Sequence, residues 1–171
     1  MAGLSDHTAA ESFGDLYERN FDRVYAYVQS MLRDRAAAED VTSQAFERAY
    51  RKRRGYRPGR GSAEAWLFGI ARNAALDELR RRKRHARMAT EPEDLEGRPV
   101  DDVAETALRR ETVRSALERL EPRERELVSL KYMAGLGNTE IAKVVGISES
   151  NVSTRLNRTM TKLREVCHDQ L

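Results

Sequence analysis

The sequence predicts an all-α protein of two small helical domains joined by a flexible acidic linker, with a helix-turn-helix in the C-terminal domain. Apolar residues recur at the spacing of amphipathic helices along most of the 171 residues. Aromatic residues make up only 6% of the chain and charged residues 35%, so the core must come from Leu, Val, Ile and Ala on helix faces. We therefore expect an N-terminal domain over residues 11–87, a linker over 88–103 and a C-terminal domain over 104–168.

The first two predicted helices span residues 11–32 and 37–52, after a short polar N-terminal tail. In the second helix Val41, Ala45 and Ala49 share the inward face. The opposite side carries a continuous polar stripe at four-three-four spacing, which consists of Asp40, Gln44, Glu47 and Arg51. Spacing alone favours an ordinary solvated surface for this stripe.

A basic loop precedes the third predicted helix. The segment 55–62 contains three glycines and a proline, which break helical periodicity, and arginines lie within it and just before it. The hydroxyl of Ser62 is suited to cap the helix that follows. A flexible cationic loop can receive an unstacked base, and a surface turn that is basic like its neighbourhood fits the composition equally well.

The third predicted helix runs from Trp66 to Arg87. Helical spacing places Trp66, Asn73, Asp77 and Arg80 along one edge of its apolar face, and the helix ends in a basic run. Aromatic rings stack bases, amides read base edges and arginines bind phosphates, so this edge suits a nucleic-acid strand. A core helix with a solvated charged tail fits the same pattern.

Residues 88–103 contain two prolines, a glycine and an acidic run, which predict a linker. Helical spacing resumes over residues 104–120. Pro122 is suited to the first turn of the next predicted helix, residues 122–133.

The most specific motif is a helix-turn-helix over residues 138–165. Ile141, Ala142 and Val145 lie on the inner face of a short helix, and Gly146 permits the tight turn. Ser148 caps a second helix, residues 149–162, that would lie in a DNA major groove. A plain helical hairpin is the alternative.

Composition also excludes several classes of protein. No basic-then-apolar leader and no apolar run of about 18 residues is present, so we expect neither secretion nor membrane insertion. The single Cys167 forms no internal disulfide and suggests the cytoplasm. His7, His85 and His168 are scattered, so no metal site is expected. Basic blocks beside an acidic connector favour a polyanionic partner.

Three segments together resemble bacterial RNA polymerase sigma factors of the extracytoplasmic-function (ECF) type. AEDVTSQAFERAYR, residues 38–51, is similar to the family's segment that binds core polymerase. GSAEAWLFGIARNAALDELRRRKR, residues 61–84, is similar to the segment that melts and reads the promoter −10 element. Residues 120–158 are similar to the domain that reads the −35 element.

The resemblance assigns roles to named residues. The implied contacts to the polymerase clamp helices are Asp40, Gln44, Glu47, Arg48 and Arg51. The implied −10 contacts, including a pocket for a flipped base, are Arg57, Arg60, Ser62, Trp66, Asn73, Asp77, Arg80 and Arg81. The implied −35 contacts are Ser150, Asn151, Ser153, Thr154, Arg155, Asn157 and Arg158.

The resemblance implies a promoter-specificity subunit that is not an enzyme and needs no cofactor. Its implied partners are core RNA polymerase, through the clamp helices and the flap, promoter DNA and an anti-sigma factor. The alternative functions are a stand-alone helix-turn-helix transcriptional regulator and a helical adaptor that binds only proteins. Two departures from the family pattern stand out: Ser43-Gln44 replaces the usual Gln followed by an acid, and the recognition helix is less basic than usual.

Overall fold

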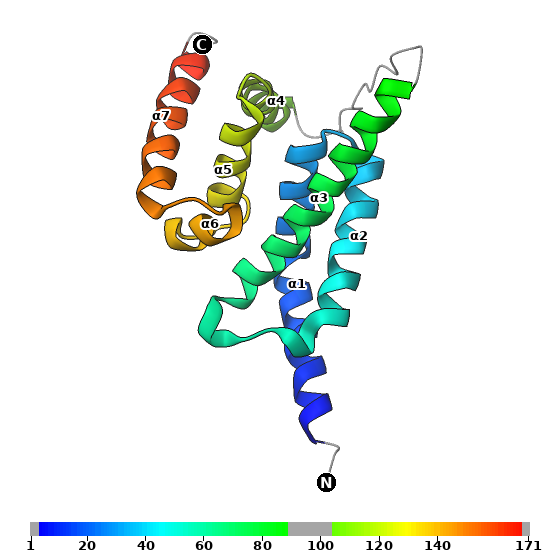
Figure 1. Cartoon of the computed structure of the whole chain (residues 1–171). Helices are drawn as coiled ribbons and strands as arrows, with labels where there is room; N and C mark the ends of the chain where they lie inside the picture. Colours follow the sequence, from blue (N-terminus) through cyan, green and yellow to red (C-terminus); the bar gives the residue numbers. More distant parts are fainter. Residues whose placement is uncertain (1–3, 89–103, 169–171) are drawn as a thin grey trace.

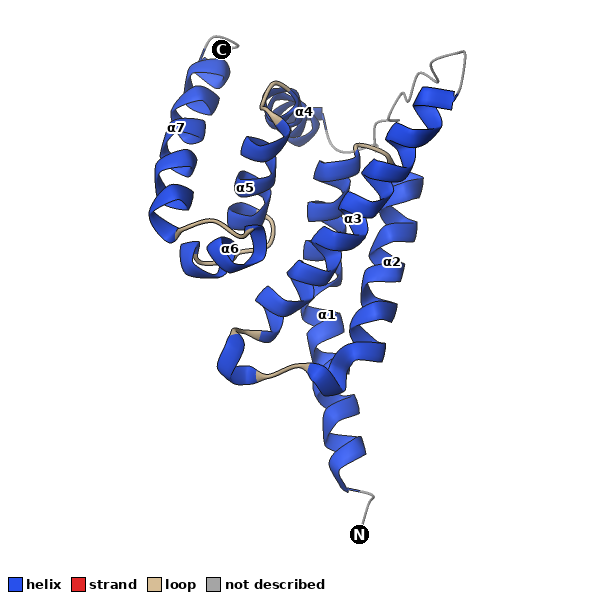
Figure 2. Cartoon of the chain, in the orientation of Figure 1, coloured by secondary structure: helices blue, strands red, loops and turns tan. Residues whose placement is uncertain are grey.

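The computed structural model describes residues 4–88 and 104–168, and these ranges are helical apart from short turns (Figures 1 and 2). Side chains are described for residues 13–88 and 108–168. The elements in chain order are α1 (Leu4–Leu32), α2 (Arg35–Lys52), η1 (Arg53–Gly55), η2 (Pro58–Arg60), α3 (Ala63–Met88), α4 (Ala104–Glu118), α5 (Pro122–Tyr132), α6 (Asn138–Val145) and α7 (Glu149–His168). The all-α class is confirmed for the described residues, while residues 89–103 of the predicted linker lie outside them.

Helices α1, α2 and α3 form a bundle in which each helix packs against the other two. Its core is apolar and includes the buried side chains Leu16, Val24, Val28, Val41, Ala45, Ala49, Leu67, Phe68, Ala71 and Ala75. The alanines allow the helix axes to approach closely. Helix α1 begins at Leu4, before the predicted start at residue 11, because no proline or glycine lies in between to stop it.

The turn between α1 and α2 is held by the far end of α3. Asp34 caps α2 by accepting a hydrogen bond from the Ala37 amide at 3.0 Å. The guanidinium of Arg82 donates to the Leu32 carbonyl at 3.2 Å and to the Asp34 carboxylate at 3.1 Å. At least one arginine of the basic run at the end of α3 therefore has a structural role.

In the C-terminal helices, α7 packs against α4, α5 and α6. Arg125 of α5 donates to the carbonyl oxygens of Leu117, Glu118 and Leu120 at 2.9, 3.3 and 3.0 Å. The Leu117 and Glu118 carbonyls lie at the C-terminal end of α4, where a helix leaves acceptors unpaired, and Leu120 lies in the turn that follows. Burial of the guanidinium, together with the nearby Arg33, lowers the Arg125 pKa from its ordinary value.

The helix-turn-helix is present as predicted. Gly146 follows α6 with a φ of 74°, in the left-handed region. The hydroxyl of Ser148 accepts a hydrogen bond from an amide in the first turn of α7 at 3.2 Å. Val152 and Leu156 are buried, and α7 continues beyond the predicted end to His168.

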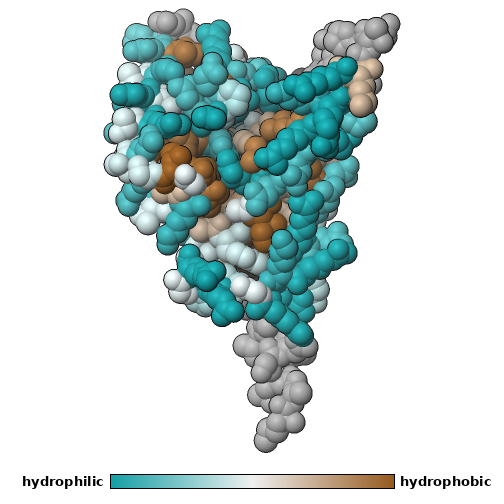
Figure 3. Space-filling view, in the orientation of Figure 1, coloured by the Kyte–Doolittle hydropathy of each residue, from teal (hydrophilic) through white to brown (hydrophobic). Residues whose placement is uncertain are grey.

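The two groups of helices pack on each other. Helix α1 lies against α5, and α3 lies against α6 (Figure 1). One cluster of buried hydrophobic residues runs through both groups, from α1–α3 into α5–α7. In the view of Figure 3 most of the surface is hydrophilic, and hydrophobic patches gather in the middle of the molecule where helices meet. We refer to the α1–α3 group as the N-terminal unit and to α4–α7 as the C-terminal unit; the predicted domain boundaries stay a prediction.

Replacing Gly146 with alanine should destabilise the fold by about 1–2 kcal/mol, because a Cβ is unfavourable at its φ of 74°. Nothing lies within 4 Å of the added carbon, so the cost is purely conformational. Gly69→Ala is the matched control, since this open position in the middle of α3 should gain about 0.5–1 kcal/mol. Urea unfolding of both variants measures the difference, and equal midpoints would contradict the assignment.

Candidate nucleic-acid interface

The polar stripe on α2 lies on the outer surface of the N-terminal unit. Asp40, Gln44, Glu47 and Arg51 are all exposed. Glu47 and Arg51 form an ion pair at 2.5 Å along the helix. The stripe is therefore available to a partner, and an exposed pair of this kind adds little to stability.

Arg48, which the resemblance assigns to the polymerase contacts, lies beside the stripe on the side of α2 that faces α3. It is half-buried, and its guanidinium lies 3.4 Å from the carboxylate of Asp77. Asp77 also pairs with Arg80 of its own helix at 3.3 Å. These ion pairs connect Arg48, a predicted polymerase contact, with Asp77 and Arg80, two predicted −10 contacts.

The basic loop before α3 places Tyr56, which sequence reasoning did not single out, against the predicted residue Trp66 of α3. The rings of Tyr56 and Trp66 lie 5.4 Å apart, tilted by 45°. The Tyr56 hydroxyl donates to the Gly61 carbonyl at 3.0 Å and so closes the loop. Arg57 and Arg60 are exposed beside this pair. An aromatic residue between arginines in a glycine-rich loop was the available signal.

Asn73, Asp77 and Arg80 are exposed on α3, in line with the predicted stripe, and Trp66 is half-buried at its beginning. From Trp66 to Arg80 the stripe extends about 21 Å along the helix axis at 1.5 Å per residue. These residues are therefore arranged along a line and do not converge on one point. A strand of several nucleotides would have to run along α3 to reach all of them.

The basic end of α3 is less cationic than its sequence suggests. Arg81 forms two hydrogen bonds with Glu78, both at 2.8 Å, and Arg82 adds a third at 3.0 Å. The bonds from Arg81, and then those from Arg82, lower the pKa of Glu78 to about 2. Glu78 therefore stays ionised and offsets part of the charge that would attract phosphates.

The outer face of α7 carries the predicted −35 residues. Five are exposed: Ser150, Asn151, Thr154, Asn157 and Arg158. The other two are half-buried and have partners in the protein. Ser153 accepts a hydrogen bond from Asn138 of α6 at 2.9 Å, and Arg155 donates to Asn151 at 2.9 Å. Asn138 was not predicted, and it ties the two helices of the helix-turn-helix together.

The exposed faces of α3 and α7 are not independent, because α6 packs on both helices. The hydroxyl of Ser62, at the beginning of α3, donates to the Glu140 carboxylate of α6. The same hydroxyl accepts from the Ala65 amide at 3.1 Å, which confirms the predicted N-cap. One predicted −10 residue is thus in contact with the C-terminal unit.

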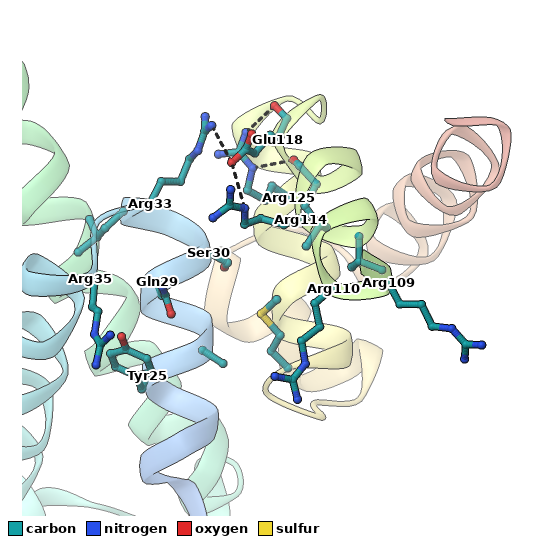
Figure 4. Close-up of a pocket in the computed structure, with 15 residues that line it drawn as sticks. Tyr25, Gln29, Ser30, Arg33, Arg35, Arg109, Arg110, Arg114, Glu118 and Arg125 are labelled. Carbon is teal, nitrogen blue, oxygen red and sulfur yellow. Dashed lines mark hydrogen bonds and ion pairs between the residues drawn. The ribbon is translucent and has the colours of Figure 1, made fainter. Parts of the chain in front are cut away.

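A groove of about 1070 Å³ lies along the seam between α1 and the helices α4 and α5 (Figure 4). Its lining includes the apolar residues Ala26, Val113 and Met133 together with a set of arginines. The Glu118 carboxylate crosses the seam to Arg33 at 3.1 Å. This groove could not be predicted from the sequence, because its two walls are distant along the chain.

Two further properties concern the described part of the chain only. No helix in it has the length and apolar character needed to cross a membrane. Across residues 4–88 and 104–168, His, Cys, Asp and Glu side chains form no group of three or more that could hold a metal ion.

Comparison with known proteins relates the chain to a family. Residues 16–85 match the family model of Sigma-70 region 2, and residues 110–163 match that of Sigma-70, region 4. The chain is 36% identical to the RNA polymerase sigma factor CarQ of Myxococcus xanthus over 160 residues, covering 92% of this chain and 90% of that protein.

Two other proteins that are similar to this chain are also sigma factors. The chain is 33% identical to the ECF RNA polymerase sigma factor BldN of Streptomyces coelicolor over 90% of its own length, and spans 61% of the length of that relative. The fold is similar to that of the sigma factor RpoE of Bartonella quintana, solved in complex with the anti-sigma factor NepR. That match has a TM-score of 0.78 and 22% identity, and it covers 91% of this chain and 96% of the other.

Three observations lead to one conclusion. They are the order of the two matched regions, the helix-turn-helix in the second region, and the identity to sigma factors over nearly the whole chain. The chain belongs to the ECF family of RNA polymerase sigma factors.

Proposed function

We propose that the protein binds core RNA polymerase and directs it to a set of promoters by recognising −35 and −10 elements and helping to melt the latter. Three polar surfaces, on α2, α3 and α7, lie within the two regions that match the sigma family. This arrangement is the observation that supports the proposal. The protein then acts by binding and carries out no catalysis of its own. Its place of action is the cytoplasm, where polymerase and promoters are found.

Each surface has a separate task in this proposal. The α2 stripe contacts the polymerase clamp helices, and the C-terminal unit contacts the flap. The exposed face of α7 reads the −35 duplex in the major groove, where amide and hydroxyl side chains can bond base edges. Its small number of cationic residues means that phosphate contacts add less to affinity than they would on a more basic helix.

The −10 surface separates strands without a chemical energy source. Binding of unstacked bases to aromatic and polar side chains offsets the cost of opening a few AT-rich steps. The exposed Asn73 can bond the edge of a base, and Arg80 can bind a phosphate. The pair of Tyr56 and Trp66 supports stacking at the start of α3.

An anti-sigma factor is a further proposed partner. The Bartonella quintana sigma factor of similar fold was solved with one bound. A partner that spans the N-terminal and C-terminal units would cover surfaces of both. Recovery of the protein from cells under repressing conditions, with only polymerase subunits attached, would count against this partner.

The first test is reconstituted transcription. The purified protein, mixed with core polymerase and a library of genomic fragments, should give run-off transcripts from a small set of start sites. The protein alone should bind the same duplexes only weakly. A stand-alone regulator would instead shift the duplex tightly without polymerase, and absence of both polymerase binding and transcripts would refute the proposal.

Charge reversal on the α2 stripe should weaken binding to core polymerase. The combined change Asp40→Arg and Glu47→Arg replaces two exposed acids, and we expect a loss of at least about tenfold in affinity, or about 1.4 kcal/mol. Asp15→Arg with Glu18→Arg makes the same change in net charge at exposed positions of α1, outside the proposed contact surfaces. This control should bind as the unchanged protein does; equal losses in both would point to a nonspecific charge effect.

Asn73→Ala should change which bases are accepted in the −10 element and leave polymerase binding intact. The exposed amide is placed to read base edges, and loss of such a contact costs about 1–3 kcal/mol of discrimination. Transcription from a promoter library with a randomised −10 element measures the preference. Arg158→Ala serves as a contrast: it should weaken use of all promoters and lower the salt dependence, with the −10 preference unchanged.

A further inference from the structure

The groove between α1 and the helices α4 and α5 is rich in arginine (Figure 4). Six of its fifteen lining residues are arginine and one is an acid. In the whole chain, by contrast, 31 basic and 28 acidic residues nearly balance. The groove volume of about 1070 Å³ is close to the upper end of the range for sites that bind small molecules. The local excess of positive charge favours an anionic occupant.

Three guanidinium groups meet around Glu118 at one end of this groove (Figure 4). One carboxylate oxygen of Glu118 lies 3.1 Å from Arg33 of α1 and 4.0 Å from Arg114 of α4. Arg125 donates to the backbone carbonyl of the same residue at 3.3 Å. Burial lowers the pKa of Arg125, and the nearby Arg33 lowers this pKa by more than Glu118 raises it. One acid therefore does not balance the three cations at this end.

The ion pairs at this end are exposed, so a ligand can exchange with them. Arg33 and Glu118 have 48% and 41% of their side chains exposed. Arg114 also pairs with the exposed Glu111, which is not part of the lining, at 3.0 Å. Exposed pairs add little to stability, whereas a planar guanidinium binds a phosphate through two parallel hydrogen bonds. A phosphate group can thus replace these carboxylate partners.

The backbone of Arg33 indicates that its side chain has a purpose beyond the fold. Arg33 follows α1 with a φ of 56°, and no other residue except glycine has a positive φ in the described part of the chain. Its amide donates to the Gln29 carbonyl at 2.7 Å. Glycine is the usual residue at such a helix end, because a Cβ is unfavourable there. Unfavourable backbone conformations of this kind are typical of functional sites.

The rest of the groove suits the body of an organic anion. Tyr25 and Gln29 line it one helical turn apart on α1. A tyrosine ring can stack on a nucleobase, and an amide can bond the edge of one. Aliphatic side chains complete both walls; they are Ala26, Leu32, Val113, Leu117 and Met133.

We propose that this groove binds a nucleotide, with the phosphates held by Arg33 and Arg114 and the nucleoside packed on the apolar walls beside Tyr25. An acidic protein segment is the alternative occupant. A stable protein interface needs roughly 1,000 Å² or more, so such a segment would have to extend beyond the groove. The ligand would contact α1 and α4 together, and nucleotide concentration would then affect the packing of the two units. This inference goes beyond the proposed function and does not depend on it.

Calorimetric titration of the full chain with ATP, in the absence of divalent metal ions, is the first test. We expect one site with a Kd below about 100 μM. Adenosine and inorganic triphosphate should each bind at least about tenfold more weakly, because each lacks half of the contacts. A short polyglutamate peptide should bind more weakly than ATP. Absence of ATP binding at about 1 mM overturns the proposal, as does triphosphate or peptide binding as tight as that of ATP.

Arg33→Gln combined with Arg114→Gln tests the location of the site. We expect the affinity for ATP to fall at least about tenfold. Arg119→Gln with Arg123→Gln removes the same charge at exposed positions that do not line the groove, and this control should bind as the unchanged protein does. Equal losses in both proteins would reveal a nonspecific charge effect and overturn the proposal.

ATP bound instead at the basic loop before α3 would be recognised by a further variant. The change Arg57→Gln with Arg60→Gln removes two exposed arginines of that loop. A larger loss of ATP affinity in this variant than in the groove variant would assign the nucleotide to the −10 surface and overturn the proposal.

Arg33→Gly separates a role in binding from a role in the fold. Glycine relieves the unfavourable φ, so the melting temperature should rise by about 2–4 °C, while the affinity for ATP should fall at least about threefold. Unchanged ATP affinity overturns the proposal. A loss of affinity together with a lower melting temperature also counts against it, because the fold itself would then be affected.

Discussion

The carboxylate of Glu126 lies almost completely out of water, and both of its partners belong to the other helical unit. A buried acid of this kind is tolerated only where a guanidinium and a hydrogen-bond donor are held in place. Tyr27 and Arg72 supply them from the middle of α1 and α3. This group thus helps to fix the position of α5 against the N-terminal unit, together with the apolar packing between the units, and α6 and α7 in turn pack on α5.

The packing of the two units also sets the spacing between the polar faces of α3 and α7. The helices α3 and α7 each present an exposed polar face, but the register of the seam places α6 between them. The separation of these two faces therefore depends on how the two units pack on each other.

Much of the fold could be predicted from the sequence because helix periodicity is a local property. The inward face of α2, the N-caps at Ser62 and Ser148 and the tight turn at Gly146 were all predicted and are confirmed. Helix ends were less predictable, since the beginning of α1 and the end of α7 carry no strong stop signal. Arg48 shows the limit for site residues: the resemblance implies that it contacts polymerase, and the sequence could not show that its side chain lies against Asp77 of α3.

The helices, the helix-turn-helix and the resemblance to a family can be predicted from the sequence, because these depend on spacing and residue type within short segments. Which charges remain available and which surfaces are covered depends instead on how the helices pack. Arg82 pairs with Asp34, Ser153 with Asn138 and Ser62 with Glu140, and the last of these contacts joins residues 78 positions apart. Such pairings depend on how helices pack, and no periodicity within one helix can reveal its neighbour.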